Sequence, residues 1–231
     1  MSNHPVDIIP TTVPRNRDEL LDAIHVVSRF SRKIHVDVDD GLFVPQVSWP
    51  YVGADMYGSA DISGLGGISI EAHLMVRDPR MIGSDLARAG VKTIVGHIEA
   101  CADISEAEKT LALWRASGAH EVGLAILIDT PVEKILPYVS LCDVVQIMSV
   151  AKVGAQGAPF DPRAIERVRI LRDVFPDLVI SVDGGINGSN IADLMAAGTA
   201  RFAVGSAIMQ TGDAARAYRQ LIELTAAAHA V

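Results

Sequence analysis

The stretch KIHVDVDDG, residues 33–41, decides the fold expected of this chain. Apolar Ile and Val side chains alternate in it with His35, Asp37 and Asp39, which is the two-residue period of a β-strand. Buried strands of parallel sheets normally carry apolar residues on both faces. We therefore interpret this strand as one whose apolar face packs against helices, while its polar face points to the axis of a barrel.

Short apolar strands alternate with amphipathic helices along the chain. The expected strands lie at residues 6–9, 33–37, 69–75, 93–97, 121–126, 143–148, 179–182 and 201–204. The expected helices lie near residues 17–30, 79–89, 105–117, 131–138, 162–174, 189–197 and 213–228. The segment 41–67 is expected to be irregular, with room for one short helix.

This alternation predicts the fold class. It implies an all-parallel sheet, and eight strand–helix units in 231 residues fit a (β/α)8 TIM barrel. We expect a single barrel domain over residues 1–231. A doubly wound open sheet is the alternative, although it usually needs fewer strands and no glycine-rich turn follows the first strand.

Particular residues mark the ends of several expected helices. Ser105, with Glu108 three residues later, has the spacing of an N-terminal capping box. Gly90, Gly118 and Gly198 each follow a helical pattern, where a glycine commonly closes the helix.

Charge and cysteine content limit the functional classes. The 28 acidic residues outnumber the 20 basic residues, which gives a formal net charge of −8. Nucleic acid and anionic membrane surfaces are therefore not expected as partners. The first residues lack the apolar core of a secretory signal, and no apolar run is long enough to span a bilayer. Cys101 and Cys142 have no metal-binding spacing, so we expect reduced thiols in a cytoplasmic protein.

Polar side chains recur at the ends of two further expected strands. Glu71 and His73 alternate with apolar residues in SIEAHLMV, residues 69–76, and Asp183 ends a strand before two glycines. A lone inward histidine is more often a packing residue, and a lone Asp before glycines is more often a turn residue. Catalytic groups, however, collect at the C-terminal rim of such barrels. Two histidines and two carboxylates on three strand ends favour one site for Zn²⁺, Mn²⁺, Fe²⁺ or Co²⁺.

Six segments together form the pattern of a known family. They read HVDVDDGLFVPQ (35–46), EAHLMVRDP (71–79), GHIEA (96–100), VGLAI (122–126), VDGGI (182–186) and AVGSAI (203–208). In order and spacing they resemble the ribulose-phosphate 3-epimerases. The combination of HxD, HLMV and VDGG is specific, whereas VDGG alone occurs in many phosphate-binding barrels. The resemblance covers nearly the whole chain and implies a TIM-barrel isomerase of carbohydrate metabolism.

The resemblance also implies roles for individual residues. One divalent metal ion, zinc foremost, would be held by His35, Asp37, His73 and Asp183. The same two aspartates would act as acid and base. The implied reaction converts D-ribulose 5-phosphate to D-xylulose 5-phosphate in the pentose phosphate pathway, through a metal-stabilised ene-diolate. Because the family forms dimers or hexamers, a homo-oligomer is implied as well.

The chemistry explains why two aspartates are needed. Epimerisation at carbon 3 of a ketose phosphate removes a proton next to a carbonyl and returns one to the opposite face. Two proton-carrying groups, one on each side of the carbon, are therefore required. A Lewis acid is also required for the ene-diolate oxygens. Asp37 and Asp183 take the proton-carrying roles by resemblance, and the sequence leaves open which of them acts first.

A sugar phosphate also needs a binding pocket. Glycines after the last two strands correspond to the usual phosphate site of such barrels, with plain turns as the alternative interpretation. His97 and Glu99 match a family HxE pair, for which we expect a supporting role. The expected substrate-binding residues are Thr11, Met75, Met148, Gly154, Gly157, Gly184, Gly185, Gly205 and Ser206.

Several positions depart from the family pattern. Asp39 replaces the family's Met, Leu42 replaces its usual His, and KVGAQGAPF replaces its glycine-rich loop at residues 152–160. These changes leave open which ketose phosphate is the substrate, so an epimerase of D-allulose 6-phosphate is a close alternative. A non-catalytic phosphosugar-binding homologue is a second alternative. A phosphosugar lyase would need a D-x-K-x-x-D array, and DVDDG supplies no lysine.

Overall fold

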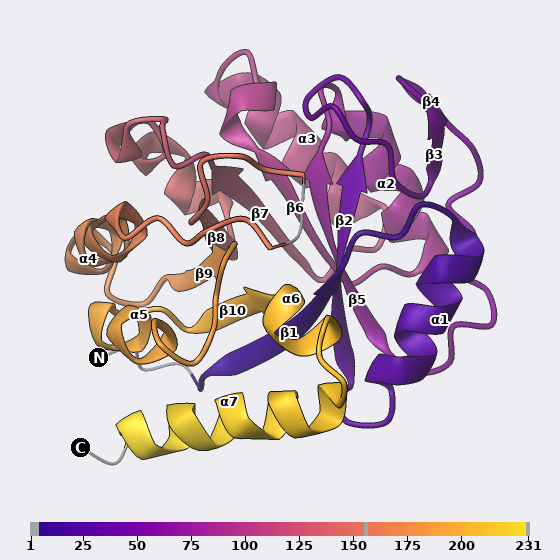
Figure 1. Ribbon diagram of the computed structural model, residues 1–231. Coiled ribbons are helices and arrows are strands. Elements are labelled where there is room, and N and C mark those ends of the chain that lie inside the picture. Colours follow the sequence, from indigo (N-terminus) through magenta and orange to yellow (C-terminus); the bar gives the residue numbers. More distant parts are fainter. Residues whose placement is uncertain (1–4, 155–156, 230–231) are drawn as a thin grey trace.

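Eight parallel strands close into a barrel in the order β1-β10-β9-β8-β7-β6-β5-β2 (Figure 1). They are β1 (Asp7–Thr12), β2 (Lys33–Asp39), β5 (Ser69–Met75), β6 (Thr93–His97), β7 (Glu121–Ile126), β8 (Val144–Met148), β9 (Val179–Asp183) and β10 (Arg201–Val204). The predicted TIM barrel is confirmed. The open-sheet alternative is wrong, because β1 pairs with both β2 and β10 and leaves no edge there.

The computed structural model describes residues 5–154 and 157–229. Both ends of the expected domain and the middle of the 152–160 loop, residues 155–156, lie outside these described residues.

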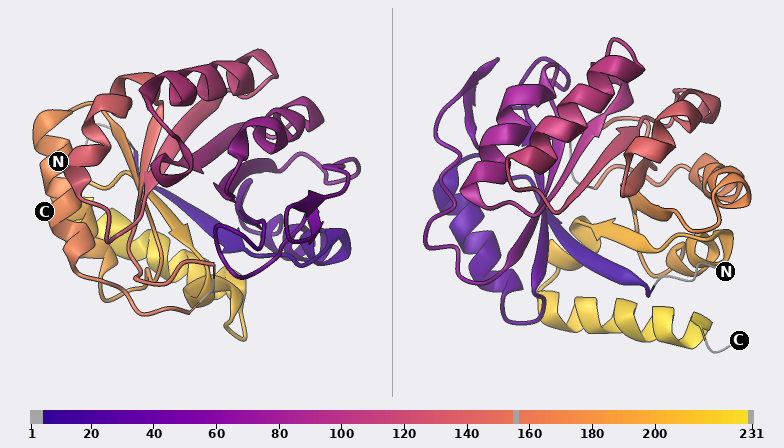
Figure 2. Two further views of the ribbon diagram at one scale, coloured as in Figure 1. Left: turned by 90° about the horizontal axis from the view of Figure 1, so that it is seen from above. Right: turned by 180° about the vertical axis from the view of Figure 1, so that it is seen from behind.

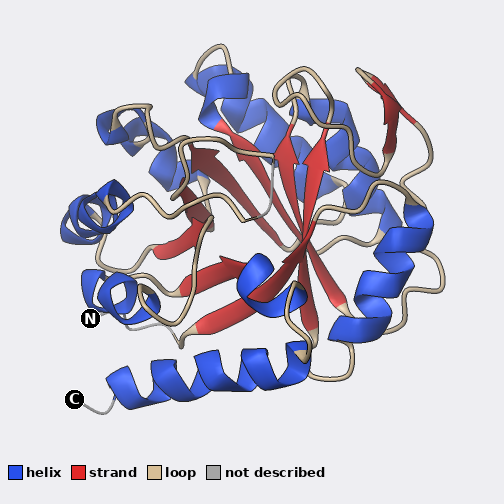
Figure 3. Cartoon of the chain, in the orientation of Figure 1, coloured by secondary structure: helices blue, strands red, loops and turns tan. Residues whose placement is uncertain are grey.

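Helices surround the barrel on its outer side (Figures 2 and 3). They are α1 (Arg17–Val27), α2 (Pro79–Ala89), α3 (Ile104–Ala116), α4 (Arg163–Val174), α5 (Ile191–Ala197), α6 (Ser206–Met209) and α7 (Ala214–His229). Within the described part of the chain, none of them combines the length and apolar character that crossing a membrane requires.

The prediction of an α-helix at residues 131–138 is wrong. This region forms two 3₁₀-helices, η2 (Val132–Lys134) and η3 (Leu136–Leu141), and a further one, η1 (Ile98–Ala100), follows β6. Pro137 explains the difference, because it has no N–H group for the i→i−4 hydrogen bond of an α-helix.

The segment 41–67 contains a small hairpin and not the expected short helix. β3 (Tyr51–Gly53) pairs antiparallel with β4 (Met56–Tyr57), separately from the barrel sheet. Two prolines and six glycines fall between residues 41 and 67, and both residue types disfavour a helix.

The two faces of β2 are divided as expected. Ile34, Val36 and Val38 are fully buried in an apolar cluster that includes Leu20 and Ile24 of α1. The polar residues between them are also buried, on the inner side of the barrel. The apolar layer between sheet and helices therefore holds the strand in place while its polar side chains build a site.

Helix ends agree only in part with expectation. The N-cap of α3 is Asp103, whose carboxylate accepts a hydrogen bond from Glu106 N–H at 2.8 Å. The capping box expected at Ser105 is therefore wrong by two positions, since Ser105 already lies inside the helix. The expected closing glycines adopt the left-handed conformation, with φ of 111°, 117° and 114° at Gly90, Gly118 and Gly198.

Candidate active site

Four buried side chains from three strands meet inside the barrel. They are His35 and Asp37 of β2, His73 of β5 and Asp183 of β9. One nitrogen or oxygen atom of each lies within 4.8 Å of the corresponding atoms of the other three. The structure thus brings together all four residues that were expected to hold a metal ion.

The polar atoms of this four-residue cluster face one another at short distances. Asp37 Oδ1 lies 2.9 Å from His73 Nδ1 and 3.3 Å from His35 Nε2. Asp183 Oδ2 lies 3.4 Å from His73 Nδ1 and 3.9 Å from His35 Nε2. Strand register explains part of this geometry, because Asp37 and His73 are direct partners on β2 and β5.

A buried chain of charged groups orients His35. Its Nδ1 lies 2.7 Å from Glu71 Oε1, and Arg201 donates to Glu71 Oε2 at 2.7 Å. Burial would raise the pKa of Glu71, but the bond from His35 and the charge of Arg201 lower it to about 2. Ionised Glu71 therefore accepts the Nδ1 proton. In the neutral ring, Nε2 then carries the free lone pair, and it has no hydrogen-bond partner among the described residues.

A second chain orients His73. His97 Nδ1 lies 3.2 Å from Glu99 Oε2, and His97 Nε2 lies 2.9 Å from His73 Nε2. Burial lowers the pKa of His97 to about 4 despite Glu99, so its ring is neutral. Because the ionised Glu99 accepts the Nδ1 proton, His97 Nε2 is an acceptor and His73 must donate from Nε2. A neutral His73 then turns an unprotonated Nδ1 toward Asp37.

This arrangement of donors fits a divalent metal ion. An unprotonated nitrogen and a carboxylate oxygen 2.9 Å apart repel each other unless a cation or a proton lies between them. Burial alone would lower the pKa of His35, but the neighbouring carboxylates of Asp37 and Glu71 raise that pKa well above the ordinary value. The cluster therefore attracts positive charge. Two imidazoles and two carboxylates are also the ligand types of Zn²⁺ and related ions, so the cluster could hold one such ion.

The two aspartates of the cluster differ in their electrostatic surroundings. Burial would raise the pKa of Asp37, but the imidazoles of His35 and His73 beside it, in their protonated forms, hold it well below its usual range. Burial and the negative charge of Asp37 raise the pKa of Asp183 to about 6. One site thus contains a carboxyl group with a lowered pKa and another with a raised pKa, which is the arrangement that acid–base catalysis uses.

Asp39 is a further acid buried beside the four-residue cluster. Neither of its carboxylate oxygens has a hydrogen-bond partner in the described part of the chain. Burial, followed by repulsion from Asp37, Asp40 and Asp183, raises the pKa of Asp39 to about 8. Met, the usual residue of the family at this position, would carry no such charge, so Asp39 is a chemical departure inside the site.

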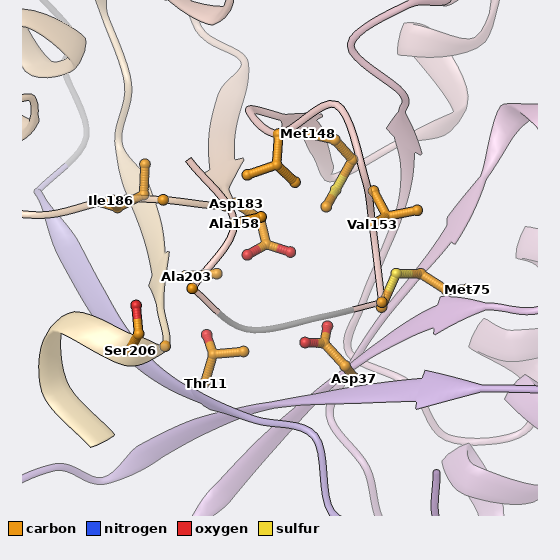
Figure 4. Close-up of a pocket in the computed structure, with 16 residues that line it drawn as sticks. Thr11, Asp37, Met75, Met148, Val153, Ala158, Asp183, Ile186, Ala203 and Ser206 are labelled. Atoms are coloured by element: carbon orange, nitrogen blue, oxygen red, sulfur yellow. The ribbon is translucent and has the colours of Figure 1, made fainter. Parts of the chain in front are cut away.

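A cavity adjoins the cluster (Figure 4). Its lining includes Asp37, Asp183 and every residue expected to bind substrate, namely Thr11, Met75, Met148, Gly154, Gly157, Gly184, Gly185, Gly205 and Ser206. Figure 4 shows the carboxylates of Asp37 and Asp183 facing the same space, with Ser206 on one side of them and Met75 on the other. The residues selected from six separate parts of the sequence therefore share one cavity.

Some contributors to the site are not predicted by the sequence. Arg201 opens the apolar strand RFAV, and this isolated charge is the only signal that it points into the barrel. The remaining lining residues are apolar and indistinguishable from core residues by type, namely Val150, Val153, Ala158, Ile186 and Ala203.

Comparison with known sequences gives consistent matches. The model of the ribulose-phosphate 3 epimerase family matches residues 7–209. The cytoplasmic isoform of ribulose-phosphate 3-epimerase from Oryza sativa subsp. japonica is 32% identical over 195 residues, which cover 82% of each chain. The ribulose-phosphate 3-epimerase of Aquifex aeolicus is 33% identical over 202 residues, which cover 86% of each chain.

Solved structures share the fold at low sequence identity. The protein described as KGPDC from Streptococcus mutans, in complex with D-R5P, superposes with a TM-score of 0.71 at 12% identity, over 95% of this chain and 96% of that one. The 3-hexulose-6-phosphate synthase of Salmonella typhimurium gives a TM-score of 0.69 at 14% identity, over 95% and 98%. At these identities the likeness concerns the barrel fold alone.

Proposed function

Because this chain belongs to the ribulose-phosphate 3-epimerase family and is therefore an isomerase, we propose that it inverts carbon 3 of D-ribulose 5-phosphate to give D-xylulose 5-phosphate. The observation that carries the proposal is the placement of Asp37 and Asp183 on one cavity, from strands that are not neighbours in the barrel. Epimerisation needs proton-carrying groups on both faces of the reacting carbon.

Each aspartate moves a proton on one face of the substrate. One carboxylate removes the proton from carbon 3, and the other, as a carboxylic acid, returns a proton to the opposite face. In the reverse reaction the two groups exchange roles. The low pKa of Asp37 and the raised pKa of Asp183 support this division of labour.

One divalent metal ion, zinc foremost, with Fe²⁺, Mn²⁺ and Co²⁺ as alternatives, would be held by His35, Asp37, His73 and Asp183. When bound, it would stabilise the negative charge that develops on the substrate oxygens after proton removal. Glu71 and His97 support this assignment, because they turn an unprotonated nitrogen of each ligand histidine toward the cluster.

The phosphate group would bind through neutral donors. No Lys or Arg lines the described cavity, so backbone N–H groups at Gly184, Gly185, Gly205 and Ser206 are the donors that remain on one side of it. Thr11 lies on the same side of the site in Figure 4. Met75 and Met148 offer apolar surface for the sugar carbons, and Gly154 and Gly157 leave room for the loop to pass close to the substrate.

The cellular setting is proposed by analogy with the family. The protein would act in the cytoplasm, as a single-domain subunit of a homo-oligomer, on a small-molecule sugar phosphate of the pentose phosphate pathway. A relative from Oryza sativa subsp. japonica is named as a cytoplasmic isoform, which supports this location.

The test is proton exchange at carbon 3, followed by NMR in deuterated water. The wild-type protein, checked by elemental analysis for about one divalent ion per chain, should exchange the proton and invert the carbon. Asp37→Asn and Asp183→Asn should each lose at least ~10²-fold in kcat, because an amide cannot carry the proton. One of the two variants should still exchange deuterium into unepimerised substrate, since one face remains active.

The matched control is Asp173→Asn, the same change at an exposed position of α4, which should keep wild-type rates. Faster exchange with D-allulose 6-phosphate than with D-ribulose 5-phosphate would identify the former as the substrate and leave the proposed mechanism unchanged. Absence of exchange with every ketose phosphate in the metal-loaded protein would instead show a non-catalytic phosphosugar-binding homologue.

A further inference from the structure

Two consecutive aspartates at the end of β2 have opposite surroundings. Asp40 is buried and satisfied, because its oxygens accept hydrogen bonds from the N–H groups of Leu42, Phe43 and Arg77 at 2.7–2.8 Å. Asp39 is completely buried, yet neither of its oxygens has a partner among the described residues. A buried carboxyl group without a partner is destabilising, so its position in the fold calls for a ligand that supplies one.

Asp39 is directed to the active site and not to the helical layer. It lies two residues after Asp37 on the same strand, so both side chains project from the same face of β2. Asp39 lies opposite Met75 of the neighbouring strand β5, and Met75 lines the cavity. Its oxygens are nevertheless not part of the four-residue metal cluster. Asp39 is not itself among the residues that line the cavity, so a substrate that contacts it must reach beyond Met75, the neighbouring lining residue.

The strand order shows which end of the substrate Asp39 would meet. The glycines of the proposed phosphate site follow β9 and β10, whereas Asp39 and Met75 end the neighbouring strands β2 and β5. Figure 4 shows Ser206 and Met75 on opposite sides of the two catalytic aspartates. A ketose phosphate with its phosphate near Ser206 and carbon 3 between the aspartates would direct carbon 1 toward the ends of β2 and β5.

We propose that Asp39 is a specificity-determining residue that hydrogen-bonds the hydroxyl group on carbon 1 of the ketose. The inference rests on the proposed function and names the part of the substrate that this residue recognises. A hydroxyl group fits the position because it is neutral and can both donate and accept a hydrogen bond. An anionic group would be repelled there, since Asp37, Asp40 and Asp183 all contribute negative charge around Asp39.

The experiment compares two substrates in two variants. The substrates are D-ribulose 5-phosphate and its 1-deoxy analogue, which keeps the carbonyl and the carbon 3 proton but lacks the hydroxyl group. The readout is the carbon 3 exchange rate, expressed as kcat/KM. In the wild-type protein the hydroxyl substrate should be preferred by at least ~10-fold, because a site built for a hydroxyl group discriminates against its absence.

Asp39→Met should lower kcat/KM for the hydroxyl substrate about 10-fold or more and change that for the 1-deoxy analogue by less than about 3-fold. Asp39→Asn, which can still donate and accept, should keep the preference within about 3-fold of wild type. Asp173→Met, the same chemical change on the exposed surface of α4, should alter neither substrate.

Equal losses for both substrates in Asp39→Met would overturn the inference and assign Asp39 to packing or to a buried water. An unchanged preference would overturn it as well. In either case exchange by the wild-type protein would leave the proposed epimerase function standing. If the wild-type protein exchanges neither substrate, the proposed function fails, and the inference fails with it.

Discussion

Glu71 links the proposed metal site to a second set of charges inside the barrel. It contacts His35 on one side and Arg201 on the other, and Arg201 also lies 3.0 Å from Glu121. Such carboxylate–histidine contacts orient a ligand ring and raise its affinity for the metal. We therefore expect this chain of charged groups to serve the proposed metal site.

Glu71→Gln keeps the shape of the side chain but removes its charge. We expect metal affinity to fall about 10–100-fold, the usual effect of losing such a partner. The measurement is competition for Zn²⁺ between the folded, metal-free protein and a chelating indicator. Glu108→Gln on the exposed face of α3 is the matched control. An affinity within about 3-fold of wild type would show that Glu71 does not orient the ligand.

Individual site residues could be predicted because their chemical types are unusual where they occur. Histidines and aspartates inside apolar strands stand out from the period of the strand, and the resemblance supplied their roles. Arg201 could not be paired with Glu71, because these residues are 130 positions apart and only barrel closure brings them together. That the carboxyl group of Asp39 has no hydrogen-bond partner among the described residues likewise becomes visible only when the surrounding donors have positions.

Secondary-structure elements differ in how well the sequence predicts them. The strands β5, β6 and β7 occupy the expected residues. The first two strands continue beyond their expected ends, where Thr11 and Asp39 still pair with neighbouring strands. The cap of α3 was misplaced because Asp103 and Ser105 both have suitable side chains, and only hydrogen-bond geometry distinguishes them.

The turn after β9 has a conformation that requires glycine. Gly185 has a φ of 64°, and a Cβ atom added there would lie 2.6 Å from the backbone nitrogen of Phe160. Gly185→Ala should therefore displace the turn or the facing loop and raise KM for the ketose phosphate about 10-fold or more, with a smaller effect on kcat.

The check for Gly185→Ala is steady-state kinetics at saturating metal. Gly67→Ala is the control, because a Cβ atom there would meet no heavy atom within 4 Å. If KM stayed at the wild-type value, this turn would not form part of the phosphate site.

At the scale of the whole molecule, the reactivity of the two cysteine thiols depends on whether the barrel is folded. Burial raises the pKa of Cys101 to about 11 and that of Cys142 to about 12. Since the thiolate is the reactive form, both thiols are nearly unreactive at pH 8 in the folded protein. Unfolding returns their pKa values to about 8.5 and increases the thiolate fraction by a factor on the order of 10² or more.

We therefore expect iodoacetamide to alkylate the native protein at pH 8 at least ~10²-fold more slowly than the protein in guanidinium chloride. Mass spectrometry resolves the two sites, and circular dichroism follows unfolding in parallel. Modification of Cys142 without loss of helical signal would contradict its position in the structure.

The carboxyl group of Asp39 has no hydrogen-bond partner in the part of the chain that the structure describes, and this has a consequence for protein engineering. Replacing it by Met removes a buried polar group without a partner, a change on the order of 1–3 kcal/mol in favour of the folded state. A selection that ranks variants by melting temperature would therefore enrich Met at position 39. The same selection would discard the proposed contact with the carbon 1 hydroxyl group, so stability and substrate choice need to be screened together at this position.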